Sequence, residues 1–110
     1  MLSQTGVTSL QSAAVATGNG AALDCSGRKQ IVAQLTGTFS ATVTWEGTVD
    51  GSTWVAVAVA DLASTTRARA TTATAAGLFL LEDVAGLQQF RARVSTYVSG
   101  SVTVKACASE

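Results

Sequence analysis

Apolar and polar side chains alternate almost without exception in the stretch Phe39-Ser40-Ala41-Thr42-Val43-Thr44-Trp45-Glu46. Successive side chains of a β-strand point to opposite faces, so this order places Phe39, Ala41, Val43 and Trp45 on one face. A period of two residues is typical of a strand with one buried face, and helical periodicity is almost absent from the chain. The stretch therefore predicts a β-strand with an apolar inner face.

Similar short stretches recur along the sequence, separated by glycine-based turns such as Asp50-Gly51 and Ser99-Gly100. They occupy residues 7–16, 22–25, 31–35, 54–59, 67–71, 78–81, 89–95 and 102–106. Residues 62–76 are rich in alanine and could form a helix on that ground, but their threonines and the Arg-Ala-Arg-Ala alternation favour strand and loop. Seven to nine short strands at spacings of about 8–12 residues predict an all-β fold, a single antiparallel β-sandwich of the jelly-roll-like or Ig-like kind.

The residues around Asp50-Gly51 predict a hairpin and its register. A three-residue loop, Val49-Asp50-Gly51, puts glycine at the left-handed position of the turn and sets Trp45 opposite Val55. A two-residue loop would move every side chain of one strand to the other face and separate the valines from their apolar partners. We therefore expect the pairs Trp45–Val55, Val43–Val57 and Ala41–Val59, with Trp54 on the outer face beside Glu46.

The length of 110 residues predicts one domain. Residues 21–110 are expected to form the sandwich, and the strand-poor residues 1–20 an N-terminal segment that docks on a neighbour or is swapped between copies. Alanine accounts for 20 residues, whereas Phe, Trp and Tyr together number six. Small side chains make a thin core with less apolar area to bury, at about 25 cal/mol per Å². We expect further copies of the chain to supply compensating contacts.

The charged residues exclude several classes of partner. Seven Lys and Arg residues balance seven Asp and Glu residues, which leaves no net field to attract nucleic acid or an anionic membrane. The chain has no His for metal binding or for acid–base catalysis near neutral pH. Glu46, Asp50 and Glu82-Asp83 form no persuasive acid–base pair or calcium site, because Asp50 suits the hairpin turn and adjacent strand residues face opposite ways. We expect no enzyme activity, no cofactor and no metal site.

The N-terminus lacks the basic leader and apolar run of a secretory signal, and no stretch is long and apolar enough to span a bilayer. The protein is therefore expected to be made in the cytoplasm of its host cell. Cys25 and Cys107 are the only cysteines and stand too far apart for a CxxC motif. Two independent thiols are the favoured interpretation for such a chain, with a disulfide joining the ends of the domain as the alternative.

Six residues are candidates for an interaction surface: Trp54, Arg67, Arg69, Arg91, Arg93 and Tyr97. Alternation along residues 89–95 turns Arg91 and Arg93 outward, and Tyr97 shares their parity. Arg67 and Arg69 repeat the pattern on another strand. Arg, Tyr and Trp are enriched at protein interfaces. The alternatives are a solvated sheet face whose arginines oppose edge-to-edge aggregation, and a Trp54 that a neighbouring loop covers.

Several segments, taken together, carry a family resemblance. They are AALDCSG (21–27), LTGTFSATV (35–43), WEGTVDGSTW (45–54), VAGL (84–87) and FRARVSTYVSGSVTV (90–104). In these segments the chain resembles small β-sandwich structural proteins of tailed bacteriophages and prophages. The resemblance covers most of the chain from residue 21 onward, and it defines no functional residue that could be transferred.

The resemblance implies a component of the virion. The implied role is a capsid decoration, or cement, protein that stabilises the head by bridging capsid subunits. Its partners would be the major capsid protein and its own copies, arranged as a homotrimer. The alternative is a tail or fibre accessory that contacts host-surface glycan, because residues 50–54 are also similar to the DGxxW hairpin of discoidin-like carbohydrate-binding sandwiches.

Overall fold

The alternating stretch around Trp45 forms the strand β4 (Phe39–Thr48), as the sequence predicts. Val43 and Trp45 have no exposed surface, so the predicted inner face is the buried one. The Trp45 ring stacks on Phe90 with centroids 6.0 Å apart, and it lies 5.3 Å from the Phe79 ring at an interplanar angle of 44°. This group of three aromatic rings occupies the core.

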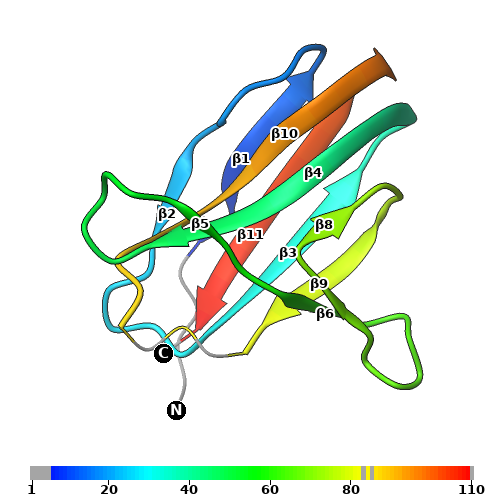
Figure 1. Cartoon of the computed structure of the whole chain (residues 1–110). Coiled ribbons are helices and arrows are strands. Elements are labelled where there is room, and N and C mark those ends of the chain that lie inside the picture. Colours follow the sequence, from blue (N-terminus) through cyan, green and yellow to red (C-terminus); the bar gives the residue numbers. More distant parts are fainter. Residues whose placement is uncertain (1–5, 83, 85, 110) are drawn as a thin grey trace.

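The computed structural model describes residues 6–82, 84 and 86–109 (Figure 1). Within them the chain forms eleven strands and no helix, so the all-β prediction is confirmed. The predicted seven to nine strands are exceeded because several strands have only two or three residues. None of the described residues belongs to a helix of the length and apolar character that a membrane span requires. The strands besides β4 are β1 (Thr8–Ala14), β2 (Ala22–Asp24), β3 (Gln30–Thr36), β5 (Val55–Ala56), β6 (Val59–Asp61), β7 (Arg69–Ala70), β8 (Thr72–Ala73), β9 (Gly77–Leu81), β10 (Gln89–Gly100) and β11 (Val102–Ser109).

The strands build two antiparallel sheets that lie face to face (Figure 1). One sheet has six strands in the order β1-β11-β3-β9-β6-β7, and the other has the order β2-β10-β4-β5, with β8 also paired to β4. Alternate residues of both sheets fill the space between them, and no surface is exposed at Ile31, Leu35, Val43, Trp45, Phe90, Ala92, Val94, Val102 and Val104. The predicted antiparallel β-sandwich is therefore the observed fold.

Two tight connections pass from one sheet to the other at the same end of the sandwich, at the upper right of Figure 1. The first joins β3 to β4 through Gly37 and Thr38, and the second joins β10 to β11 through Ser101; we call them the two arches. The Ser101 N–H donates to the Thr38 carbonyl at 3.1 Å. Gly37 and Gly100 have φ values of 116° and 86°, and a Cβ on either would clash with the backbone of the other arch. Glycine is required at both positions because the two backbones touch.

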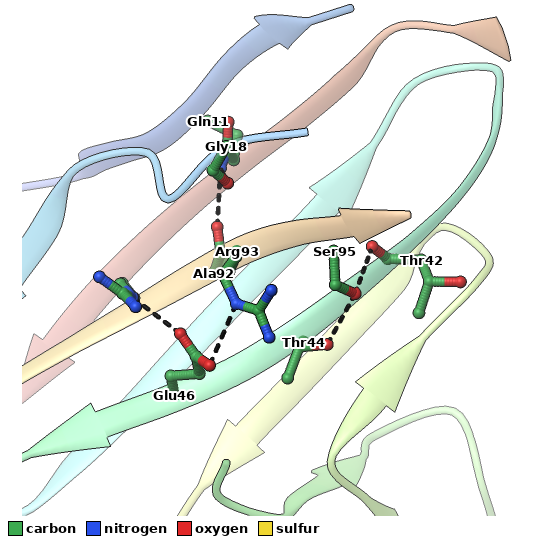
Figure 2. Close-up of polar contacts among 9 residues, drawn as sticks. Gln11, Gly18, Thr42, Thr44, Glu46, Ala92, Arg93 and Ser95 are labelled. Carbon is green, nitrogen blue, oxygen red and sulfur yellow. Dashed lines mark hydrogen bonds and ion pairs between the residues drawn. The ribbon is translucent and has the colours of Figure 1, made fainter. Parts of the chain in front are cut away.

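The N-terminal residues that the structure describes belong to the sandwich. β1 pairs with β11, and Leu10 lies in the core with 1% of its surface exposed. The buried Gln11 amide donates to the carbonyl oxygens of Gly18 (3.1 Å) and Ala92 (2.8 Å), which links β1 to β10 of the other sheet (Figure 2). Gly18 in turn exchanges two backbone hydrogen bonds with Val94. Residues 8–20 thus close one side of their own chain's sandwich, whereas residues 1–5 of the predicted segment lie outside the described residues.

The predicted register of the hairpin around Asp50 is wrong by two residues. Gly47 pairs with Val55 and Glu46 with Ala56, and the Val57 N–H donates to the Trp45 carbonyl at 2.9 Å. A shift of two residues leaves each side chain on its predicted face. The outer face of this part of β4 is therefore still the one that carries Glu46.

The loop is longer than predicted, from residue 49 to residue 54, because side chains satisfy its backbone. The Asp50 carboxylate accepts the N–H groups of Ser52 and Thr53 at 2.8 and 2.9 Å, and the Thr48 hydroxyl accepts that of Gly51 at 3.0 Å. Gly51 has a left-handed φ of 80°, as the sequence predicts. These bonds stabilise a wide loop in place of a three-residue turn.

The chain changes sheet after β5 and again after β7. The predicted strand 54–59 divides into β5, which stays beside β4, and β6, which joins β9 in the other sheet. Of the predicted strand 67–71 only Arg69 and Ala70 are in a strand, which is β7 beside β6, and a further strand, β8, follows it beside β4. Val43 consequently pairs with Ala73, and the predicted pairs Val43–Val57 and Ala41–Val59 are wrong.

We predict that Gly100→Ala destabilises the fold by about 3 kcal/mol or more, because the added Cβ clashes with backbone in addition to straining a left-handed φ. Gly27→Ala is the matched control, since Gly27 has a φ of 73° but open space where its Cβ would lie. Strain alone should cost this control about 1 kcal/mol. Urea unfolding measures both losses, and equal losses would contradict the role of the close contact.

Candidate functional site

The outer face of the five-stranded sheet carries a charged cluster at its centre. Glu46 on β4 is only 7% exposed although it points away from the core. Its two carboxylate oxygens accept one guanidinium each from β10: Arg91 Nε donates at 2.8 Å and Arg93 Nε at 3.1 Å. Figure 2 shows Glu46 reaching from β4 toward Arg93. The side chains of Arg91 and Arg93 are 15% and 37% exposed, so the cluster lies at the surface while its carboxylate is covered.

The aromatic ring of Trp54 packs against this cluster. The guanidinium carbon of Arg91 lies 4.1 Å from the centroid of the Trp54 ring. Such a cation–π contact contributes about 0.5–2 kcal/mol, depending on how far it is desolvated. Trp54 ends the loop that Asp50 organises, and the N–H groups of Thr53 and Ser52, followed by the Thr48 hydroxyl, hold the pKa of Asp50 below its usual value. We call Glu46, Trp54, Arg91 and Arg93 the arginine cluster.

A hydroxyl network continues the polar face beyond the arginine cluster. Ser95 Oγ donates to the Thr42 carbonyl at 3.2 Å, and it lies 2.8 Å from Thr44 Oγ1 (Figure 2). Because the single Ser95 proton is used by Thr42, the Thr44 hydroxyl is the donor in the second bond. Thr44 is 9% exposed, so this row of polar side chains is ordered as well as outward-facing.

Tyr97 does not belong to the outward stripe that the sequence predicts. Arg93 pairs with Thr44 in register, but the register shifts by one residue around Ser95, and Tyr97 pairs with Ala41. A β-bulge of this kind reverses the alternation, so Tyr97 packs against the core. Its hydroxyl donates to the Gly100 carbonyl at 2.6 Å. The predicted Arg-Arg-Ser-Tyr stripe therefore ends at Ser95.

Arg67 and Arg69 lie apart from the arginine cluster. Arg69 is on β7 at the edge of the six-stranded sheet, where it pairs with Glu82 at 3.0 Å. Arg67 lies in the loop before β7 with a φ of 53°, and its Nη1 donates to the Leu62 carbonyl at 2.6 Å. Neither Arg67 nor Arg69 is on the five-stranded sheet, and only Arg91 and Arg93 join Trp54 on one surface.

Sequence reasoning missed the role of Glu46, which it treated only as one of several acidic positions. The available signal was its outward parity on β4, which matches the outward parity of Arg91 and Arg93. The missing information was that β10 pairs with β4 and sets Arg91 directly opposite Glu46. Asp83, the other half of the weighed Glu82-Asp83 pair, lies outside the described residues.

The two thiols are independent, as the favoured interpretation predicts. Cys25 is buried in the core, where its Sγ donates to the Leu23 carbonyl, and Cys107 lies partly exposed on β11. Burial, and secondarily the neighbouring Asp24 carboxylate, raises the pKa of the Cys25 thiol to about 11. Within the part of the chain that the structure describes, no group of three or more potential ligand side chains is placed to hold a metal ion.

The fold and the surface define a two-sheet antiparallel β-sandwich with an ordered arginine cluster on one outer face. This sandwich is similar to the solved structure of the SPBc2 prophage-derived protein YomS, with a TM-score of 0.90 and 15% identity over 100% of this chain and 96% of that one. It is also similar to the PBSX exported protein XepA, with a TM-score of 0.89 and 16% identity over 99% of this chain but 38% of that one. At these identities the likeness shows a shared fold. No family model and no curated protein matches the sequence.

The resemblance to small β-sandwich proteins of phages and prophages is confirmed at the level of the fold, because the fold is shared with two prophage-derived proteins. The chain corresponds to nearly the whole of YomS and to little more than a third of XepA.

We predict that Glu46→Gln lowers the free energy of unfolding by about 1.5–3 kcal/mol, because two guanidinium groups lose the charge they share. Glu82→Gln is the matched control, since it removes an ion pair whose side chains are 55% and 39% exposed. That control should lose about 0.5 kcal/mol or less. Chemical denaturation measures both, and similar losses would contradict a structural role for the covered carboxylate.

We predict that Cys25 makes the protein less stable at alkaline pH. The unfolded chain, with a thiol pKa of 9.0 in place of about 11, releases its proton first as the pH rises. The folded state then holds more protons than the unfolded state, so stability falls across the interval between these two pKa values. Urea midpoints measured across this interval should fall less steeply for Cys25→Ala than for Cys107→Ala. Parallel curves for the two variants would assign the fall to other groups.

Proposed function

We propose that the protein is a non-enzymatic structural component of a bacteriophage particle, and specifically a capsid decoration protein. In this role it coats the head as a homotrimer and stabilises it by bridging copies of the major capsid protein. The fold shared with two prophage-derived proteins supports the phage origin. The virion is then its place of action.

The arginine cluster is the observation that carries the proposal. Arg and Trp are enriched among the residues that dominate binding energy at protein interfaces. Here Arg91 is already held by Glu46 at 2.8 Å and by the Trp54 ring at 4.1 Å from its centroid. Side chains ordered before binding lose less conformational entropy when a partner arrives. An outer sheet face whose central arginine is already held in place in this way is suited to binding another protein.

The composition supports a protein that is covered by neighbours. The chain has 20 alanines and only 13% charged residues. Small side chains let backbones approach closely, and charge is depleted at the centres of interfaces. Five valines are each at least 62% exposed and could be covered by sister copies: Val7, Val15, Val49, Val55 and Val98. These features favour contacts with copies of the chain and with the capsid.

A tail or fibre accessory that binds host-surface glycan is the second candidate. The observation in its favour is that Trp54 is partly exposed on an outer face, where an aromatic ring can stack on a sugar. The name of XepA, which describes that protein as exported, fits a role outside the host cell. The two candidates differ in what Trp54 should bind.

We predict that Trp54→Ala reduces binding to phage heads that lack the protein by about tenfold or more, as expected for an interface hot spot. Co-sedimentation with such heads, together with analytical ultracentrifugation of the free protein, provides the measurement. Arg69→Ala is the control, because it removes a large exposed side chain on the other sheet. A protein that stays monomeric, ignores heads and loses polysaccharide retention on Trp54→Ala would replace the decoration role with the glycan-binding role.

A further inference from the structure

The two arginines of the arginine cluster have hydrogen-bond donors that the protein itself does not use. Each guanidinium donates its Nε–H to Glu46, and the hydrogen bonds and ion pairs of the described residues include no partner for the Nη atoms of Arg91 or Arg93. Among these residues the only buried side-chain polar atom without a partner is Trp45 Nε1. The Nη groups of both arginines therefore reach solvent.

The cluster also has a surplus of positive charge. Glu46 contributes one negative charge, and Arg91 and Arg93 together contribute two positive charges. The cluster therefore has a net charge of one positive unit. Arg69 belongs to the other sheet, as does Lys105 on β11. Arg67 lies in the loop before β7, and Arg28 and Lys29 lie in the connection between β2 and β3. The surplus is therefore local to the centre of this face and suits one anionic group.

From these contacts we propose that the arginine cluster binds a carboxylate, namely the side chain of an Asp or Glu on the protein partner. A guanidinium presents its N–H groups as a planar fork that matches the two oxygens of a carboxylate. Anchoring through Nε leaves the Nη groups of both arginines to receive the ligand. Trp54 packs against the Arg91 guanidinium and helps to fix its position.

Other anions fit the cluster less well. A nucleic acid or other polyphosphate requires a stripe of several basic residues, because its affinity comes from neutralising many phosphates. The cluster offers two arginines and one glutamate on a chain with no net charge. An acidic sugar would gain most from a free aromatic face, but one face of the Trp54 ring is already covered by Arg91. A single protein carboxylate needs only the free Nη donors and the one surplus positive charge of the cluster.

This inference rests on the proposed function for the identity of the partner, and it is tested on the whole 110-residue chain without that partner. The probe is the blocked peptide acetyl-Ala-Glu-Ala-amide, with acetyl-Ala-Gln-Ala-amide as its uncharged match. Titration of ¹⁵N-labelled protein follows the Nε–Hε resonances of Arg91 and Arg93. We expect the Glu peptide to shift both resonances with a Kd in the millimolar range, and the Gln peptide to bind at least about tenfold more weakly.

Variants of Arg93 distinguish the contribution of the planar guanidinium fork to binding from the contribution of its positive charge. Arg93→Gln should weaken binding of the Glu peptide at least about fivefold, and Arg93→Lys, which keeps the charge but loses the fork, should lie between that variant and the unmodified protein. Arg69→Gln should leave the Kd unchanged. Added salt should weaken binding, because Arg93 is exposed to screening.

Defined outcomes would overturn the inference. Equal binding of the Glu and Gln peptides, or no change in Kd on Arg93→Gln, would show that the cluster has only a structural role. Binding of glucuronic acid or of inorganic phosphate at least about tenfold tighter than the Glu peptide would assign the cluster to another class of ligand. Protein that binds heads but not the peptide would refute this inference alone. Protein that binds the peptide but not heads would refute the decoration role and leave the carboxylate site standing.

Discussion

The close contact between the two arches is the constraint on which the rest of the structure depends. Gly37 and Gly100 bring two backbones together where a single Cβ would separate them, and the Ser101–Thr38 hydrogen bond joins the two turns. From this end β10 and β4 run antiparallel, from the pair Gly100–Phe39 to the pair Gln89–Thr48. The positions of the outward side chains on these strands follow from where that pairing begins and from the two register shifts between Val94 and Ser99. The arginine cluster therefore depends in part on two glycines at the far end of the sheet.

Local patterns in the sequence predicted those parts of the fold that local geometry decides. β3, β4 and β9 coincide closely with predicted stretches, since each alternates between a buried and an outward face. The outward placement of Trp54 beside the Glu46 face also follows from parity, although the loop length was wrong. The division of residues 54–59 between two sheets has no local signature, because valine and alanine suit either sheet. The Tyr97 prediction fails for a similar reason, since one extra residue at Ser95 reverses the alternation without changing the pattern.

The candidate site was less accessible to sequence reasoning than the fold was. Trp54, Arg91 and Arg93 can each be singled out by residue type, but their grouping depends on β10 lying beside β4, which a single sequence does not specify. Arg67 and Arg69 have the same pattern as the cluster arginines, and yet Arg69 belongs to the opposite sheet and Arg67 to the loop before β7.

The form of the sheet edges bears on how readily copies of this chain can pair through their backbones. A protein without net charge has little mutual repulsion to keep its copies apart at working concentrations. The outermost strands are β1, whose pairing is interrupted by two register shifts, and β2, β5 and β7, which have two or three residues each. Short or bulged edges are poor templates for the backbone of another molecule. Among the described residues, the short and irregular edge strands therefore limit backbone pairing between molecules. The outer faces of the sheets, with their side chains, remain as the surfaces through which copies and partners can bind one another.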